Sequence, residues 1–308
     1  MTLHAMNRRT FLETATTVTA ATLLTHGTSW AAGDHKIEKD RIGVQLYSVR
    51  KAMADDFDGS LAKVAAAGYT RVELAEFSFD GGQVRYFKRT PQEMKAALDH
   101  DGLDAISTHL NYKFLTPEIF PKVLEASHVL GHKYIVCPWI DEEFRKGPDV
   151  WKHACETFNR VGEASQKAGF QFGYHNHWFE FLPVDGKLPY DILLEGCDPK
   201  FVKMELDLCW ITAAGKDPVT YFERYPGRFP LVHVKDLKSL PHITAGGPQN
   251  FGDTADLTEV GSGIIDWKRI FAHSEQAGIK YYIVEHDHPQ APFDSIRTSY
   301  EYLIKLRW

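Results

Sequence analysis

Short apolar stretches alternate with helix-like segments along nearly the whole chain after residue 40, and this alternation constrains the fold more than any other feature. Strand candidates lie at 41–49, 70–77, 103–109, 134–138, 171–181, 201–207, 229–235 and 280–285. Helix candidates lie at 57–67, 90–101, 116–130, 149–168, 188–195, 218–225, 266–277 and 293–306. Three of these helices end in Ala-Gly before the next strand, at residues 67–68, 168–169 and 277–278. Glycine in this place typically closes a helix in the left-handed conformation.

Eight strand–helix units in roughly 270 residues favour a closed barrel over an open sheet. The open alternative, a doubly wound sheet, usually carries a Gly-rich phosphate loop after its first strand. Here the first strand candidate continues instead into Tyr47-Ser48-Val49-Arg50. We therefore predict an α/β protein with a single-domain (β/α)8 TIM barrel over residues 33–308.

The first 32 residues are typical of an export signal rather than of a folded segment. Asn7-Arg8-Arg9-Thr10-Phe11-Leu12 resembles a twin-arginine (Tat) motif, and Met6 would place it at the usual distance from a start site. An apolar run at 15–24 follows, and Ser29-Trp30-Ala31 offers small residues for a signal peptidase. The run is too short for a stable membrane span. A disordered tail is the alternative, but the pattern predicts a Tat signal peptide over 1–32 and a periplasmic protein.

Composition excludes some classes of function. The chain has 308 residues, is 44% hydrophobic and 25% charged, and carries a formal net charge of −6, so it lacks the basic footprint of a nucleic-acid-binding protein. Its four cysteines include no Cys-x-x-Cys pair, which argues against a structural zinc cluster. We expect Cys137, Cys155, Cys197 and Cys209 to be buried free thiols.

Polar side chains gather where the predicted strands end. In a TIM barrel these ends meet at one face, where the active site lies. The candidates are Gln45, Tyr47, Glu73, Glu76, His109, Asn111, Cys137, Trp139, His175, His177, Glu180, Glu205, Asp207, His233, Lys235, Glu285, His286 and Asp287. One such residue alone would more often be structural, but carboxylates and imidazoles facing one another are costly to bury unpaired. A bound cation removes this cost, so strands five to eight predict a divalent-metal site.

Several of these segments carry a family resemblance that covers nearly the whole mature chain. The segments are Tyr174-His175-Asn176-His177-x-x-Glu180-Phe181, Met204-Glu205-Leu206-Asp207, His233-Val234-Lys235-Asp236, Val260-Gly261-Ser262-Gly263-Ile264-Ile265-Asp266-Trp267 and Val284-Glu285-His286-Asp287. They resemble the xylose-isomerase-like TIM-barrel superfamily, and in particular its exported branch described as sugar phosphate isomerase/epimerase. That superfamily includes sugar isomerases and epimerases, inosose dehydratase and endonuclease-IV-type enzymes.

The resemblance implies four ligands for one divalent metal: a glutamate, an aspartate, a histidine and a second glutamate from strands five to eight. Asp207, His233 and Glu285 match the last three. The epimerases carry the first glutamate inside strand five, where this chain has His175 and His177 with a glutamate only at 180. We place Glu180 first as this ligand and His177 second, and keep His175 as a ligand or acid–base candidate.

This donor set suits Mn²⁺, Mg²⁺, Co²⁺ or Zn²⁺, and we favour Mn²⁺. A metal in such a site acidifies the C–H beside a sugar carbonyl, and a nearby base removes the proton. The catalytic candidates are Glu180, Glu285, His175, His177 and Lys235. The substrate-binding candidates are Glu73, His109, Trp139 and Trp178. Several of these roles have a structural alternative. Lys235 could form an ion pair with Asp236, Glu73 and His109 could be a polar lining of the barrel mouth, and the tryptophans could be packing residues.

The residues therefore predict a divalent-metal-dependent sugar isomerase or epimerase. The first alternative is a 3-keto-glycoside lyase, hydratase or dehydratase that uses the same chemistry. The second is a sugar-binding barrel without catalysis. No arginine cluster or Gly-rich loop for a phosphate follows strand seven, so we expect a neutral sugar or keto-glycoside as substrate. The long loop at 238–259 is expected to be a lid or a subunit contact. In the second case the protein would be a homo-oligomer.

The twin-arginine motif gives a direct test of export. Replacement of Arg8 and Arg9 by lysine should retain the protein in the cytoplasm, because the motif is expected to depend on the paired guanidinium groups. Cell fractionation followed by immunoblotting measures the result, with Lys36→Arg in the mature chain as the control. Unchanged export of the double variant would refute Tat dependence.

Overall fold

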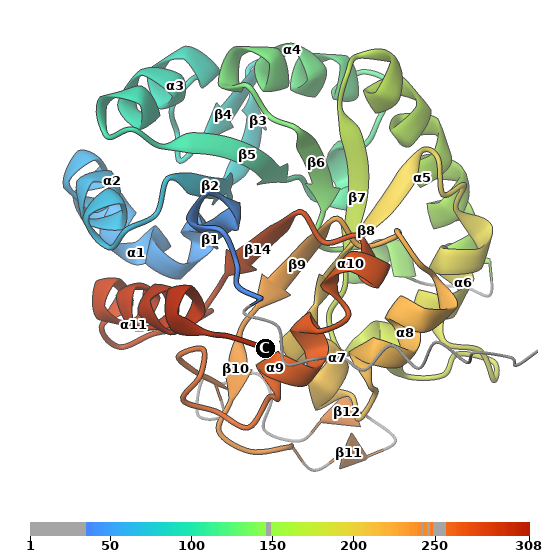
Figure 1. The fold of residues 1–308 in the computed structure, drawn as a ribbon. Helices are drawn as coiled ribbons and strands as arrows, with labels where there is room; N and C mark the ends of the chain where they lie inside the picture. The colour runs from blue at the N-terminus through green and yellow to red at the C-terminus, as the bar shows by residue number, and fades with distance from the viewer. Residues whose placement is uncertain (1–34, 146–148, 242, 245–246, 249–256) are drawn as a thin grey trace, which may run out of the picture. The chain divides into compact units, whose positions relative to one another are not determined.

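Eight parallel strands close into one barrel, which confirms the predicted fold (Figure 1). The computed structural model describes residues 35–145, 149–241, 243–244, 247–248 and 257–308, and this barrel lies within them. Around the ring the strands follow the order β1-β14-β9-β8-β7-β6-β5-β2, and the helices form an outer layer. The predicted signal peptide at 1–32 lies outside the described residues, so it stays a prediction.

Three barrel strands end at least three residues before the end that the sequence predicts. The barrel strands are β1 (Ile42–Gln45), β2 (Arg71–Leu74), β5 (Asp104–His109), β6 (Tyr134–Cys137), β7 (Gln171–His175), β8 (Val202–Asp207), β9 (Leu231–Val234) and β14 (Tyr281–Val284). The candidates at 41–49 and 171–181 end at Gln45 and His175 because side chains there bind nearby backbone, and the candidate at 70–77 ends at Leu74, before Glu76 with a φ of 53°. Gln45 accepts a hydrogen bond from the backbone N–H of Tyr47, and Glu180 accepts one from that of His177. These bonds start 3-10 turns, Leu46–Val49 and Phe179–Phe181, in place of further strand.

The helices largely follow the predicted positions. They are α1 (Arg50–Asp55), α2 (Phe57–Ala66), α3 (Pro91–His100), α4 (Phe120–Leu130), α5 (Val150–Lys167), α6 (Pro189–Gly196), α7 (Leu208–Ala213), α8 (Pro218–Arg224), α9 (Trp267–Phe271), α10 (Ser274–Ala277) and α11 (Pro292–Lys305). The glycines after α2, α5 and α10 have φ values of 107°, 89° and 82°, which confirms their role as helix ends. A start of α4 at Thr116 was wrong: Pro121 is tolerated only in the first helical turn, so the helix begins at Phe120.

Three small antiparallel pairs, which the sequence analysis did not predict, extend from the barrel. They join β3 (Phe77–Asp80) to β4 (Gln83–Tyr86), β10 (Asp236–Leu237) to β13 (Leu257–Thr258), and β11 (Ile243–Thr244) to β12 (Gly247–Pro248). The β10–β13 pair holds together the two ends of the 238–259 loop. Residues 249–256 lie outside the described part, so a lid or subunit contact there stays a prediction.

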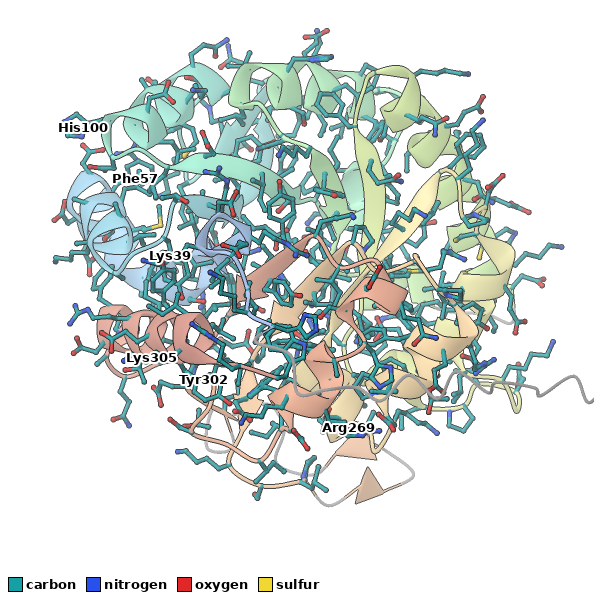
Figure 2. The ribbon with its side chains drawn as sticks, in the orientation of Figure 1. Lys39, Phe57, His100, Arg269, Tyr302 and Lys305 are labelled. Atoms are coloured by element: carbon teal, nitrogen blue, oxygen red, sulfur yellow. The ribbon has the colours of Figure 1, made fainter. Side chains whose placement is uncertain are left out.

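The outer layer is polar and the interior holds the thiols. Figure 2 places His100 of α3 and Lys305 of α11 at the periphery, and both side chains are mostly exposed. Among the described residues, no helix combines the length and the apolar character that crossing a membrane requires. All four cysteines are free and buried, which confirms the expectation for them.

Asp236 organises the glycine-containing segment at 260–267. Its carboxylate accepts hydrogen bonds from the backbone N–H groups of Gly261 (2.9 Å), Gly263 (3.2 Å) and Ile265 (3.2 Å) and from the indole N–H of Trp267 (2.9 Å). A Cβ atom at Gly263 would lie 2.2 Å from Asp236 Oδ1, so only glycine allows this close approach. Asp236 directly follows Lys235, so these bonds fasten the segment just after the end of β9.

Asp236→Asn tests this role. The variant should lower the free energy of unfolding by about 3 kcal/mol, because a buried charged acceptor of several N–H donors becomes a neutral amide. Urea denaturation measures the change. Asp294→Asn, at a side chain that is 72% exposed, should lower it by less than about 1 kcal/mol. Equal effects of the two substitutions would contradict this account.

Candidate active site and metal centre

Asp207, His233 and Glu285 converge at the end of the barrel where the strands finish. Asp207 is the last residue of β8, His233 lies in β9 and Glu285 follows β14. Each offers one ligand atom within 4.8 Å of the others. His233 Nδ1 lies 3.0 Å from Glu285 Oε2 and 4.0 Å from Asp207 Oδ2. All three side chains are buried. The structure thus brings together three of the four residues expected to bind a metal.

Asp207 is oriented by its own backbone surroundings. Its Oδ1 caps α7 by accepting a hydrogen bond from the backbone N–H of Trp210 (2.7 Å), and its own N–H donates to Asn176 Oδ1 (3.1 Å). Its Oδ2 is buried and has no hydrogen-bond partner among the described residues, although the ammonium group of Lys235 lies 3.2 Å away. One carboxylate oxygen is therefore left to face the cluster.

His175, at the end of β7, extends this cluster. Its Nε2 lies 3.9 Å from Asp207 Oδ2, and its Nδ1 lies 3.2 Å from Glu205 Oε2. Burial and the neighbouring His233 lower the pKa of His175 well below its usual value, so the ring is neutral and has one N–H. A donor at Nδ1 leaves the Nε2 lone pair directed at Asp207. Two electron-rich atoms that face each other require a cation nearby.

Lys235 supplies a positive charge in the metal-free chain. Its Nζ lies 2.6 Å from Glu285 Oε2 and 3.1 Å from Asp287 Oδ1. Burial alone would lower the pKa of Lys235, but the surrounding carboxylates raise it, so the group stays charged. Burial would likewise raise the pKa of Glu285, but Lys235 and His233 lower it well below its usual value. The described ion pairs of Lys235 are with these carboxylates and Asp207, not with Asp236 as the structural alternative proposed.

Glu73, His109 and Glu205 form a second polar group against the first. His109 Nε2 lies 2.9 Å from Glu73 Oε1 and 2.8 Å from Glu205 Oε2, and Gln45 donates to Glu73. Burial alone would lower the pKa of His109, but the two carboxylates raise it to about 9. Burial and the charge of Glu73 raise the pKa of Glu205 to about 7. Glu73 and His109 therefore lie in the buried polar layer of the barrel.

Glu180, the leading candidate for the first metal ligand, lies outside these groups. Its Oε1 accepts a hydrogen bond from the hydroxyl of Tyr174 (2.5 Å), and its Oε2 accepts one from the backbone N–H of His177 (2.8 Å). Burial raises its pKa to about 7. Because β7 ends at His175, Glu180 is carried into the following 3-10 turn, and His175 lies beside Asp207 instead.

An aromatic row connects the metal-ligand cluster to the loops above it. The ammonium group of Lys235 lies 5.1 Å from the ring centre of Trp210, and the ring of His177 lies 5.8 Å from Trp210 and 4.8 Å from Trp139. His177 Nδ1 is buried without a hydrogen-bond partner in the described part of the chain, and burial lowers the pKa of the ring to about 3. Trp178, another substrate-binding candidate, instead packs against Phe179 and the hydrophobic core.

The residues present fit a divalent metal. Two ligands about 2.1 Å from one ion at tetrahedral angles are about 3.4 Å apart. The distances in the cluster, 3.0 Å, 3.9 Å and 4.0 Å, bracket this value. Asp207 Oδ2, His233 Nδ1 and Glu285 Oε2 would hold the ion, and His175 Nε2, 3.9 Å from Asp207 Oδ2, is the candidate fourth ligand. The unpartnered Asp207 Oδ2 would gain a partner. The His109, His175, Glu205 and His233 side chains form another group whose spacing could hold a metal.

Sequence reasoning assigned no role to Glu205 or Asn176. The strand period carries the signal for Glu205, because residues two apart in a strand point to the same side, and Asp207 is two residues further along β8. The signal for Asn176 is only its place between two histidines of the strand-five motif. Its hydrogen bond to Asp207 depends on strand register, which places His175 beside Glu205 and Asp207 beside His233.

Comparison with known proteins agrees with the fold and identifies the family. The family model described as xylose isomerase-like TIM barrel matches residues 61–306, and the chain belongs to this family. It is 24% identical over 279 residues to an inosose dehydratase of Lacticaseibacillus casei, covering 80% of this chain and 88% of the relative. It is 26% identical over 278 residues to the inosose dehydratase of Geobacillus kaustophilus (strain HTA426), covering 81% and 87%.

A solved structure shows the same relationship in three dimensions. It is a sugar phosphate isomerase/epimerase from Parabacteroides distasonis ATCC 8503, with a TM-score of 0.69 and 29% sequence identity. The match covers 88% of this chain and 96% of that chain. The relatives are thus named for enzymes that modify sugars or related polyols, and the residue-level similarity to each of them is modest.

The charge pattern of the second group predicts how pH changes stability. In metal-free protein the free energy of unfolding should fall as pH rises from about 7 to about 10, and His109 should contribute roughly 2–3 kcal/mol of the fall. Its pKa is raised from 6.5 to about 9, so its stabilising charge is fully present below 6.5 and is lost as pH passes 9.

Urea denaturation in EDTA at several pH values measures this effect for the wild type and for His109→Gln. The variant carries no imidazole, so its free energy of unfolding should fall less steeply over the same range. Parallel curves for the two proteins would show that His109 is not held protonated by Glu73 and Glu205.

Proposed function

We propose that this protein is a divalent-metal-dependent sugar isomerase or epimerase that removes a proton beside a sugar carbonyl. The observation that carries the proposal is the convergence of Asp207, His233 and Glu285 at the strand-end face of the barrel, with His175 Nε2 3.9 Å from Asp207 Oδ2. This ligand set revises the expected one, because His175 replaces Glu180. Two carboxylate oxygens and two imidazole nitrogens suit Mn²⁺, which we favour among Mn²⁺, Mg²⁺, Co²⁺ and Zn²⁺.

The chain's own residues supply the proton-transfer groups. A bound divalent ion would act as a Lewis acid on the sugar carbonyl and acidify the adjacent C–H. Glu285 removes the proton, since Lys235 and His233 keep its carboxylate ionised. Lys235 donates a hydrogen bond to the oxygen that gains negative charge. A base on one side of the substrate and a proton donor elsewhere are the two requirements of this chemistry.

His177 is the second proton-transfer group in this proposal. It is half-buried, its Nδ1 has no partner among the described residues, and it lies in the aromatic row between Trp139 and Trp210. Trp139 offers an apolar ring for the face of a sugar. Glu180 supports His177 indirectly by binding its backbone N–H.

A neutral sugar or keto-glycoside is the proposed substrate. The printed names of the relatives, inosose dehydratase and sugar phosphate isomerase/epimerase, support a polyol or sugar bearing a carbonyl. We also propose that the protein acts in the periplasm, on the basis of the twin-arginine motif at Arg8 and Arg9. An exported enzyme meets mostly unphosphorylated sugars, which agrees with the absence of an arginine cluster after strand seven in the sequence.

Elimination is the second candidate reaction. The inosose dehydratases that cover 80–81% of this chain favour it, because dehydration begins with the same proton removal. The reactions differ in the next step: an epimerase returns the proton to carbon, whereas a dehydratase or lyase expels a substituent from the neighbouring carbon. A sugar-binding barrel without catalysis is the remaining class of function.

Incubation with free ketoses and 3-keto-glucosides in D₂O separates these functions. Proton NMR would show solvent deuterium beside the carbonyl together with an epimer for an epimerase, and an unsaturated or cleaved product for a lyase. Glu285→Gln should reduce deuterium incorporation by about 10²–10⁴-fold, because it removes the proposed base.

The control is Glu301→Gln on α11, whose exposed side chain pairs only with Lys305 among the described ion pairs. It should exchange deuterium at the wild-type rate. Wild-type protein that binds these sugars without exchange would refute the enzyme proposal, and full exchange by Glu285→Gln would remove Glu285 from the mechanism.

A further inference from the structure

Three imidazole rings meet one oxygen of Glu205. Glu205 Oε2 lies 2.8 Å from His109 Nε2, 3.2 Å from His175 Nδ1 and 3.3 Å from His233 Nε2. His233 Nε2 lies closer to Glu73 Oε1, at 2.8 Å, and is hydrogen-bonded to it. Glu205 is fully buried, on β8 between the strands that carry His175 and His233. Register places it directly beside His175, while Asp207 of the same strand lies beside His233.

This arrangement determines which ring nitrogen of each histidine carries hydrogen. An ionised carboxylate oxygen only accepts hydrogen bonds, so the nitrogens that face Glu205 are the donors. A neutral imidazole has one N–H, so the opposite nitrogen then presents a lone pair. These opposite nitrogens are His175 Nε2, 3.9 Å from Asp207 Oδ2, and His233 Nδ1, 3.0 Å from Glu285 Oε2. The lone pair of His175 Nε2 therefore points toward the proposed metal position. Burial alone would lower the pKa of His233, but the surrounding carboxylates raise it well above its usual value, so in the metal-free chain its Nδ1 carries a proton, which a bound ion would replace.

We propose that Glu205 is a positioning residue of the metal centre, and that its Oε2 sets the tautomer and the ring orientation of His175, while Glu73 Oε1 does the same for His233. This inference rests on the metal site in the proposed function. Histidine ligands commonly donate their second N–H to a carboxylate, which fixes the ring and strengthens metal binding. Here Glu205 serves His175 and Glu73 serves His233. His109 Nε2 contacts both carboxylates and links them, at 2.8 Å from Glu205 and 2.9 Å from Glu73.

A different role for Glu205 would require the opposite tautomers. If Glu205, His109, His175 and His233 held a second ion, His175 Nδ1 and His233 Nε2 would carry the lone pairs. Their N–H groups would then point at Asp207 and Glu285. The number of bound ions and the tautomers of these two rings therefore distinguish a positioning residue from a ligand.

Metal titration of the full chain tests the inference. Wild type, Glu205→Gln and Glu180→Gln are stripped with EDTA, checked for equal folding by circular dichroism, and titrated with Co²⁺ while the visible spectrum is recorded. We expect one ion in each protein, a 10–100-fold weaker affinity and an altered spectrum in Glu205→Gln, and wild-type values in Glu180→Gln. Glu180 is the matched control because it is also a buried strand-end carboxyl but contacts neither ring.

Each outcome has a definite meaning. Unchanged affinity and spectrum in Glu205→Gln, or two ions in the wild type and one in that variant, would overturn the positioning role alone. A wild type that binds no ion would overturn the proposed metal site together with it. Loss of the ion in Glu180→Gln would return the first-ligand role to Glu180 and also overturn the inference.

A second measurement does not depend on the variant folding. Nitrogen-15 NMR of Zn²⁺-loaded wild-type protein reports which nitrogen of each imidazole carries hydrogen. We expect the N–H at Nδ1 of His175 and at Nε2 of His233. The reverse assignment for His175 would show that Glu205 does not orient that ligand, and the reverse assignment for His233 would show the same for Glu73.

Discussion

Burial of several carboxylates at one end of the barrel is the constraint on which the rest of the site depends. Glu73, Glu205, Asp207 and Glu285 are all withdrawn from water, and charged groups in such surroundings are stable only beside opposite charges. In the metal-free chain Lys235 and protonated imidazoles provide these charges. A divalent ion in the same place would provide them and also carry out chemistry, which is why the proposed function begins from this cluster.

Strand β8 connects the two halves of the site. Glu205 and Asp207 point to the same side of the strand, so one side chain can orient His175 while the other faces the metal position. Asn176 and the start of α7 each use one hydrogen bond to hold Asp207. Small displacements of β8 would therefore alter ligand geometry and ligand orientation together, and the surrounding barrel provides the required rigidity.

The family and the site together support one first step for the proposed reaction, but they do not determine its product. Proton removal beside a carbonyl is common to an epimerase and a dehydratase, and the same base and the same cation serve both. The product depends on whether the proton returns to that carbon or a substituent leaves from the neighbouring carbon. The aromatic row of Trp210, His177 and Trp139 is the part of the site that would contact the rest of a sugar or glycoside.

The sequence by itself determined the barrel, because helix-closing glycines and alternating apolar segments are local signals, and it identified Asp207, His233 and Glu285 as strand-end residues. It did not determine that strand five ends at His175. Because the strand ends there, His175 lies in the cluster and Glu180 lies outside it. Only tertiary structure decided that, since pairing with strand β8 brings His175 to Glu205 and Asp207. Tyr174 and the His177 backbone bind Glu180 away from them. The role of Glu205 likewise depends on register between β7, β8 and β9, which no single segment encodes.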